Sequence, residues 1–457
     1  MIESIAPTPP GPTGRARLAT IARLAREGIL AAFARMARDY GPVSRLRLPG
    51  QTMVYLADPA LVEQILVTRQ HEFVRDVGAA VARDLLGEGL LTTEDPVHLA
   101  RRRLMQPAFS KARVMTYAAD VIAASERVAA GWRDGDVIDI GRAMRRLTLD
   151  AVGTALVGAD LRDDADAIAS VLSEIGGRGS AFDFTVLLVA PLLAKLNERG
   201  GGGLFFRKER KRLEAILAPI VARARAADGA DLVATLARAR GDDGFELDDV
   251  ALRSELVTLV LAGHETTSIA LTWTWYLLAL HPSAERRFHA ELDAVARDRD
   301  VRVEDVARLP YTAAVFAEAM RLHPPVPAFA RRPLEDIELG GYAIPAGTSL
   351  YISAALSARE PHAFPGPAMF RPERWLDGEK ISKFAAFPFG GGSKRCIGEP
   401  FAELEGILAL ATIGRRFAFR TTEAEPVEAA TGASQRPERT IEVRVVPRAR
   451  LRGERVA

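Results

Sequence analysis

Cysteine is almost absent from this sequence: Cys396 is the only one among 457 residues. A lone cysteine cannot form an intramolecular disulfide, so a disulfide scaffold is excluded and a reducing compartment is favoured, which we expect to be the cytoplasm. Net charge is scarce as well, because 61 Lys and Arg residues oppose 59 Asp and Glu residues and leave a formal charge of +2. Such an even balance argues against a nucleic-acid-binding protein.

Long apolar runs are missing too. Residues 1–14 form a proline-rich tail without the apolar region of a signal peptide or the ~20 apolar residues that span a membrane. We therefore expect no stable membrane anchor. The sequence has no internal repeat, low-complexity region or clear linker, so residues 1–457 are predicted to form one catalytic domain, although the length would permit two or three.

The most informative stretch surrounds the cysteine. Three consecutive glycines at 390–392 permit a tight turn, and an apolar-periodic helix is predicted from Ile397 onward. Lys394 and Arg395 lie between the turn and the helix. Because cations and a helix N-terminus both favour a thiolate, we predict that the pKa of the Cys396 thiol is lowered, as a metal ligand or a nucleophile requires. A buried structural cysteine is the alternative interpretation.

The spacing Phe389-x-x-Gly392-x-x-x-Cys396-x-Gly398 resembles the haem-binding loop of the cytochrome P450 family. The resemblance implies a soluble, bacterial-type member in which Cys396 is the axial thiolate ligand to the iron of haem b. The family most often has Arg or His where this chain has Lys394, and a lysine cannot make the planar, bidentate contact that an arginine makes with a haem propionate. The implied cofactor-binding residues of the loop are Phe389, Gly392, Lys394, Arg395, Cys396 and Gly398.

A long helix is predicted over residues 247–281, which would span about 50 Å. The stretch Ala262-Gly-His-Glu-Thr266 lies near its middle, where the small pair Ala262 and Gly263 would let a planar cofactor lie against the helix. Thr266 can donate a hydrogen bond back to the carbonyl of Ala262 and open the helix locally. The stretch resembles the oxygen-activation motif of the family, which implies a catalytic proton relay through Glu265 and Thr266. A core helix that buries polar residues is the alternative.

Basic residues at two further places are candidates for binding the haem propionates. His98 and Arg102 are four residues apart on a predicted helix and so share one face, although a solvated basic face explains them equally well. Arg331 lies where the family has a second propionate-binding arginine. The neighbouring Arg332 leaves that assignment uncertain by one residue.

Two further sets of residues follow from the resemblance. Glu318 and Arg321 form a Glu-x-x-Arg motif on a predicted helix over residues 310–323, and with Arg374 they are expected to form a buried, structural ion-pair network. The residues expected to line the substrate pocket are Val326, Ala328 and Phe329.

The implied fold is the cytochrome P450 fold, a mainly α structure with small β-sheets (α+β) and a long central helix over the haem. Residues 73–89 are interpreted as a loop that faces the substrate, and the glycine-rich run 199–203 as a flexible connection in a lid. Strands are predicted over residues 43–48, 53–57, 337–344, 349–352 and 440–446.

The implied activity is monooxygenation: insertion of one oxygen atom from O₂ into an apolar small molecule of the terpenoid, fatty acid, steroid or polyketide class. Only 61 residues follow Cys396, so we expect electrons from an external ferredoxin or flavodoxin with its reductase. A basic docking face for that partner is expected from Arg101, Arg103, Lys111, Arg113 and Arg395. The alternatives are a peroxide-driven peroxygenase, a non-catalytic haem-binding recruitment protein and a cysteine-nucleophile enzyme without haem.

Overall fold

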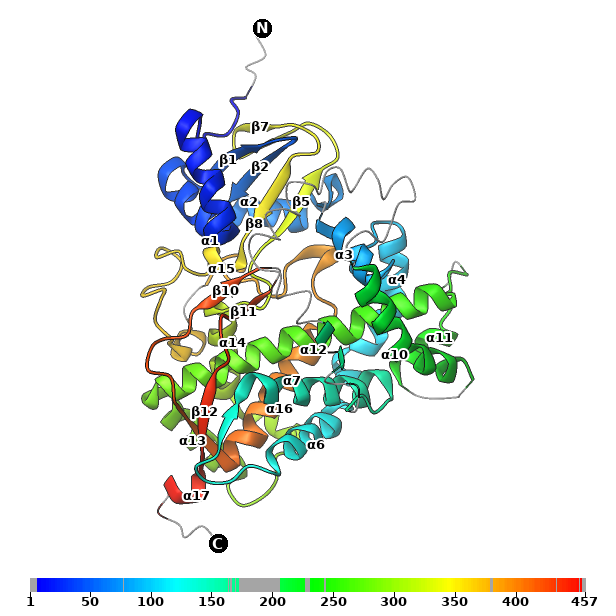
Figure 1. The fold of residues 1–457 in the computed structure, drawn as a ribbon, viewed down its shortest axis with the longest axis vertical. Helices are drawn as coiled ribbons and strands as arrows, with labels where there is room; N and C mark the ends of the chain where they lie inside the picture. The colour runs from blue at the N-terminus through cyan, green and yellow to red at the C-terminus, as the bar shows by residue number, and fades with distance from the viewer. Residues whose placement is uncertain are drawn as a thin grey trace.

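The computed structural model describes residues 6–76, 78–162, 164, 167–168, 170–171, 206–226, 231–241, 244–378, 381–432, 434–451 and 453. Within these ranges the fold is mainly helical with small sheets, as predicted (Figure 1). The helices are α1 (Gly14–Tyr40), α2 (Pro59–Glu63), α3 (Gly78–Leu86), α4 (Val97–Met105), α5 (Lys111–Met115), α6 (Ala118–Ala129), α7 (Ile140–Val152), α10 (Arg207–Ala226), α11 (Leu232–Arg238), α12 (Asp249–Leu280), α13 (Pro282–Ala296), α14 (Pro310–Leu322), α15 (Ala354–Ser357), α16 (Glu399–Arg416) and α17 (Arg448–Leu451).

In the part of the chain that the structure describes, the strands form four small sheets. The largest has the order β1-β2-β8-β5-β3, and the others are β4-β12-β9, β6-β7 and β10-β11. The strands are β1 (Val43–Leu48), β2 (Gln51–Leu56), β3 (Phe73–Arg75), β4 (Val137–Asp139), β5 (Phe329–Pro333), β6 (Ile337–Leu339), β7 (Tyr342–Ile344), β8 (Ser349–Ile352), β9 (Phe417–Thr421), β10 (Ala429–Thr431), β11 (Gln435–Pro437) and β12 (Glu442–Pro447).

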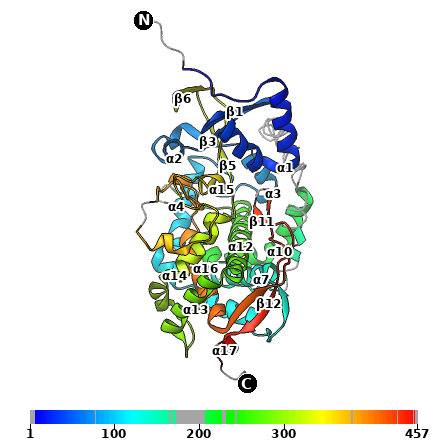
Figure 2. The ribbon, with the colours of Figure 1, turned by 90° about the vertical axis from the view of Figure 1, so that its left-hand side faces the viewer.

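The helix α12 is the centre of the arrangement. Its first turn is capped by Asp248, whose carboxylate accepts a hydrogen bond from the backbone N–H of Ala251 at 2.7 Å. Residues on every side of the helix are buried, because α7, α10, α14 and α16 all pack against it. Figure 2 looks nearly along this helix and shows its neighbours around it.

The helix α16, which follows the cysteine loop, approaches two neighbours very closely. A Cβ at Gly406 would lie 2.4 Å from Cε1 of Phe316 on α14, and a Cβ at Gly414 would lie 2.5 Å from Cζ of Phe288 on α13. Both distances are far below normal van der Waals contact. Glycine at these two positions therefore allows α16 to pack flush against aromatic rings.

The five-stranded sheet fixes the positions of several charged side chains. In its antiparallel β3–β5 pair, Arg75 stands opposite Arg331. Because side chains alternate across a strand, Arg331 and Arg332 face opposite sides of the sheet. The tail before α1 also joins this sheet, since the backbone N–H of Arg45 on β1 donates to the carbonyl of Pro10 at 2.7 Å.

The interpretation of residues 73–89 as a loop is wrong. Residues 73–75 pair with β5 as strand β3, and residues 78–86 form α3, which packs against α10 and α12. Tertiary contacts stabilise these short elements, and their local sequence carries no clear periodic signal. The glycine-rich run 199–203 lies outside the described residues.

The predicted network of Glu318, Arg321 and Arg374 is present and completely buried. Arg321 donates to both carboxylate oxygens of Glu318 at 2.8 Å, and Nε of Arg374 donates to Oε1 at 3.0 Å. The indole N–H of Trp375 adds a bond to Oε2 at 2.9 Å. Backbone carbonyls accept the remaining guanidinium protons of Arg321, so the charges are both paired and hydrogen-bonded.

We predict that Arg374→Leu lowers the free energy of unfolding by about 3–5 kcal/mol, because it leaves part of a buried charge without its partner. Denaturant unfolding of the haem-loaded protein measures the change. Arg35→Leu is the control, because Arg35 and Asp39 form a surface pair in which both side chains are about half exposed. A loss as small in Arg374→Leu as in the control would contradict a stabilising role for the network.

Candidate active site

Cys396 lies in a tight loop. A short 3-10 turn at Gly392–Lys394 precedes it, and α16, which packs against α14, follows it. The backbone N–H of Cys396 donates to the carbonyl of Phe389 at 2.9 Å, which closes the loop on itself. Gly392 has a φ of +69°, and a Cβ there would lie 1.6 Å from the carbonyl oxygen of Leu66. Only glycine permits this approach, which explains its place in the sequence pattern.

The prediction that the pKa of the Cys396 thiol is lowered is wrong, because the surrounding residues of the protein raise this pKa. Burial is the largest influence and raises the pKa of the thiol, although the side chain still presents accessible surface. The backbone N–H groups of Gly398 and Glu399 and the charge of Arg102 oppose the rise. The two neighbouring cations contribute little, because Arg395 is ion-paired with Glu399 and Lys394 with Glu94.

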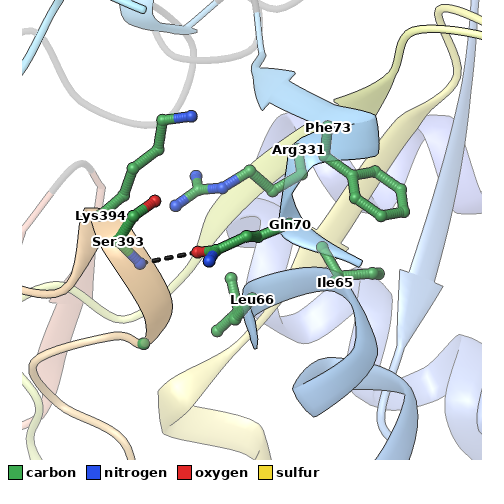
Figure 3. A pocket seen from close by; sticks show the side chains of 8 residues that line it. Ile65, Leu66, Gln70, Phe73, Arg331, Ser393 and Lys394 are labelled. Atoms are coloured by element: carbon green, nitrogen blue, oxygen red, sulfur yellow. Dashed lines mark hydrogen bonds between the residues drawn. The ribbon is translucent and has the colours of Figure 1, made fainter. Parts of the chain in front are cut away.

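A pocket beside the cysteine loop collects positive charge. Figure 3 shows the guanidinium of Arg331, from β5, and Lys394, from the cysteine loop, in the same space. The pKa of Arg331 is lowered to about 10, chiefly by burial and to a smaller extent by nearby Arg75, while Glu94 opposes the shift. The pocket is lined by Ile65, Leu66, Gln70, Phe73, Arg331, Gly391, Ser393 and Lys394.

The carboxylate of Glu94 lies near three cations, Lys394, Arg75 and Arg331. Glu94 lies 2.8 Å from Nζ of Lys394 and 3.5 Å from Nη1 of Arg75, and Arg75 is in turn close enough to Arg331 to affect its pKa. Arg75 and Glu94 are not among the residues predicted from the sequence, because the strand that carries Arg75 was interpreted as a loop. Its pairing opposite Arg331 is the signal that could have found it.

The helix α4 brings the predicted pair to the same site. Nη1 of Arg102 donates to the backbone carbonyl of Arg395 at 2.7 Å, directly beside the cysteine. The ring of His98 is buried, and its Nδ1 lies 3.0 Å from Oδ1 of Asp95. Burial lowers the pKa of His98, and Arg75 lowers it further while Asp95 opposes this.

The expected basic docking face needs correction. Arg101 is buried and ion-paired at 2.7 Å with Glu255 of α12, so it cannot meet a partner at the surface. Arg395 is partly neutralised by Glu399, and Nε of Arg113 donates to the hydroxyl of Tyr117 at 3.2 Å. Arg101 faces inward because Glu255 comes from a distant segment that sequence reasoning did not connect with it.

The middle of α12 presents the predicted groups. Oγ1 of Thr266 donates to the carbonyl of Ala262 at 2.6 Å, which confirms the expected bond, although the helix remains continuous there. Ala262 is exposed. A Cβ at Gly263 would lie 3.1 Å from Cγ2 of Val152, so glycine at this position also allows α7 to pack closely against α12.

The expected pocket residues follow α14 and enter β5. Val326 is exposed, and Ala328 and Phe329 are half-buried. The ring of Phe329 packs edge-on against Phe387 with centroids 6.2 Å apart, and the guanidinium carbon of Arg331 lies 5.0 Å from its centroid. The segment thus connects the cationic pocket with the cysteine loop.

A model of the family described as Cytochrome P450 matches residues 9–443. The chain belongs to the cytochrome P450 family. It is accordingly a cytochrome P450 monooxygenase, and its cofactor is haem.

Proteins similar to this chain come from the genus Streptomyces. The cyclooctatin synthase of Streptomyces melanosporofaciens is 38% identical over 394 residues, which cover 83% of each chain. The pentalenene oxygenase of Streptomyces avermitilis is 30% identical over 387 residues, 82% of this chain and 83% of the relative. The crystal structure of the cytochrome P450DA heme domain superimposes with a TM-score of 0.84 at 25% identity, and the match covers 97% of this chain and 98% of that one.

The residues of this P450 fit haem, which carries a metal centre and two carboxylates. The accessible thiol of Cys396 would supply the metal ligand, and the excess of largely buried cations over Glu94 would suit the anionic propionates. Among the described residues, no helix has the length and apolar character needed to cross a membrane.

Another buried acid lies on α16, the helix that packs against α12. Glu405 of α16 is completely buried, and within the described part of the chain neither of its carboxyl oxygens has a hydrogen-bond partner. Burial therefore raises the pKa of Glu405 well above its usual value, while the neighbouring Thr267 hydroxyl acts in the opposite direction. The fold favours the protonated form of this acid.

We predict that Arg331→Leu raises the rate of haem loss by roughly 10- to 100-fold, as expected from losing about 1.5–3 kcal/mol of charge-assisted hydrogen bonding. Arg332→Leu is the matched control, since its side chain faces the opposite side of the sheet. Transfer of haem to an excess of an apo-haem protein measures the rate. Faster loss from Arg332→Leu than from Arg331→Leu would reverse the assignment.

We predict that Glu405→Gln gains stability relative to the native protein as the pH rises. The folded protein retains the proton of Glu405 at a pH where the unfolded chain has released it, so this group's stabilisation is complete below the unfolded pKa and is lost as the pH rises through the folded pKa. The gain should reach up to about 1.4 kcal/mol per pH unit over this window. Unfolding free energies from about pH 5 to about pH 9 test this, and an unchanged difference between the two proteins would contradict it.

Proposed function

We propose that this P450 inserts one oxygen atom from O₂ into a terpenoid, by hydroxylation or epoxidation. The observation that carries the substrate class is the similarity to three relatives. Beside cyclooctatin synthase and pentalenene oxygenase, cyclooctat-9-en-7-ol 5-monooxygenase of Streptomyces melanosporofaciens is 33% identical over 393 residues. The last two names describe oxygenation of an unsaturated hydrocarbon and of an unsaturated alcohol. Such weakly polar substrates suit a pocket bordered by Val326, Ala328 and Phe329.

Cys396 would hold the haem iron, and cations from four segments would hold its carboxylates. Arg75, Arg331 and Lys394 surround one side of the site, while Arg102 and His98 approach the cysteine loop from α4. When bound, a haem with a thiolate ligand supplies the activation of O₂, because the sulfur donates electron density to the metal. Since a thiol must lose its proton to become a ligand, haem loading would overcome the raised pKa of Cys396.

The chain's own contribution to the chemistry is proton supply and exclusion of water. Thr266 commits its hydroxyl proton to the carbonyl of Ala262, so its oxygen presents lone pairs that can accept another hydrogen bond. Glu265, the preceding residue, would supply protons to that hydroxyl. Electrons would come from an external ferredoxin or flavodoxin with its reductase.

Two alternatives have specific observations against them. A peroxide-driven peroxygenase of this fold would be expected to lack the acid–threonine pair, which this chain has at Glu265 and Thr266. A non-catalytic haem-binding recruitment protein would be expected to lack the threonine as well. Both alternatives remain outcomes of the experiment.

The test is turnover of the purified haem-loaded protein with a surrogate ferredoxin, its reductase and a panel of cyclic terpene hydrocarbons and alcohols under ¹⁸O₂. A product carrying one ¹⁸O atom supports the proposal. Product only with added peroxide indicates a peroxygenase, and a normal reduced carbon monoxide spectrum with no product from either system indicates recruitment. Oxygenation of fatty acids or steroids alone would refute the terpenoid class.

We predict that Thr266→Ala lowers the yield of product per electron by roughly 10-fold or more and releases the difference as peroxide, because a positioned proton donor contributes about 10²–10⁴-fold to rate. Thr274→Ala is the matched control, since Oγ1 of Thr274 donates to the carbonyl of Ala270 at 2.7 Å in the same helix. Product and peroxide are quantified against electrons consumed. Equal coupling in both variants would remove Thr266 from the proton relay.

A further inference from the structure

The carboxylate of Glu265 is bound by residues from the other end of the chain. Oε1 of Glu265 accepts a hydrogen bond from Oγ of Ser434 at 2.9 Å and another from Nε of Arg436 at 2.9 Å. Nη2 of Arg436 donates to the same oxygen and completes an ion pair, and Nε of Arg436 also lies 3.0 Å from Oγ of Ser434. Both charged side chains are largely shielded, with 22% of Glu265 and 30% of Arg436 exposed.

The three bonds all end on one oxygen. Within the described part of the chain, Oε2 of Glu265 has no hydrogen-bond partner. Donors that converge on Oε1 restrict the orientation of the carboxylate and leave Oε2 open to a further hydrogen-bond partner. The three bonds therefore orient the carboxylate of Glu265 and leave its second oxygen accessible.

Ser434 and Arg436 belong to the hairpin formed by β10 and β11. Two hydrogen bonds at Gln435 attach this hairpin to the rest of the fold. The backbone N–H of Gln435 donates to the carbonyl of Pro325 at 2.9 Å, and the indole N–H of Trp273 on α12 donates to the carbonyl of Gln435 at 2.9 Å. Trp273 is fully buried and stacks on His323 with ring centroids 3.8 Å apart. Ser434 and Arg436 flank this anchored residue, so their positions relative to α12 are set by the fold.

The same anchor reaches the expected substrate pocket. Pro325, whose carbonyl holds Gln435, immediately precedes Val326 and the segment that continues to Phe329. One hydrogen bond therefore separates the backbone of the pocket wall from the residues that orient Glu265. A substrate that shifts this wall also shifts the partners of the carboxylate.

We propose that Arg436 and Ser434 are positioning residues for Glu265, which couple the pocket wall at Pro325 to proton supply at Thr266. The inference rests on the proposed proton relay. Arg436 contacts the acid itself, and its proposed role is exerted through that contact. Loss of such a supporting contact typically costs about 10- to 100-fold in activity.

The decisive variants are Arg436→Gln, which removes the ion pair, and Arg436→Lys, which keeps a cation. We expect Arg436→Gln to lower product per electron by roughly 10-fold and to raise peroxide correspondingly, with a larger solvent deuterium isotope effect on turnover, whereas Arg436→Lys recovers part of the coupling. Arg439→Gln is the matched control. Arg439 belongs to the same segment but is ion-paired with Glu423, and this variant should couple like the native protein.

The inference is overturned if Arg436→Gln couples as well as Arg439→Gln. It is also overturned if combining Arg436→Gln with Thr266→Ala gives fully additive losses, because residues of one relay act as a unit. If Arg436→Gln fails to incorporate haem, the positioning role is tested with Ser434→Ala, which removes only one neutral hydrogen-bond donor. Unchanged coupling in Ser434→Ala refutes the role of the hairpin.

Coupling in Thr266→Ala tests the proposed proton relay separately from the positioning role of Arg436. Native coupling in Thr266→Ala refutes the relay itself. Uncoupling in Thr266→Ala together with native coupling in Arg436→Gln leaves the relay in place and refutes only the positioning role.

Discussion

Buried positive charge is the constraint on which the site depends. Arg75, Arg331 and Lys394 converge from a strand pair and a loop that are far apart in the sequence, and Glu94 is the one carboxylate paired with them in the structure described. Charges buried without equal opposition are expensive, and the cost falls when an anion enters. The sheet register, the close approach of Gly392 to Leu66 and the closed cysteine loop together hold this arrangement, which the two carboxylates of haem would complete.

The chain treats its buried charges in two different ways. Around Glu318 every strong donor and acceptor has a partner within the protein, so the network is a finished structural part. Around Arg331 the positive charges exceed the negative, and the difference is left for a ligand. This contrast separates a structural cluster from a binding site without reference to either motif.

Much of the fold could be predicted because its motifs are local. The cysteine loop, the central α12 and the Glu-x-x-Arg pair each lie within one segment, and their spacing indicated the family. Errors arose where a distant segment decides. The pKa of Cys396 was predicted to fall, but burial, with a smaller contribution from the charge of Glu399, raises it. Arg101 was likewise misassigned to the surface, since its partner Glu255 lies on another helix.

The contact of α16 with α14 and α13 has an evolutionary consequence. Gly406 fits because Phe316 occupies the space of its missing side chain, and Gly414 stands in the same relation to Phe288. Neither member of a pair can change alone, since a methyl group would collide with the ring and a smaller ring would leave a void. Across descendants of this chain, each glycine should therefore vary together with its aromatic neighbour, and the helix behind the cysteine should drift in sequence only by paired steps.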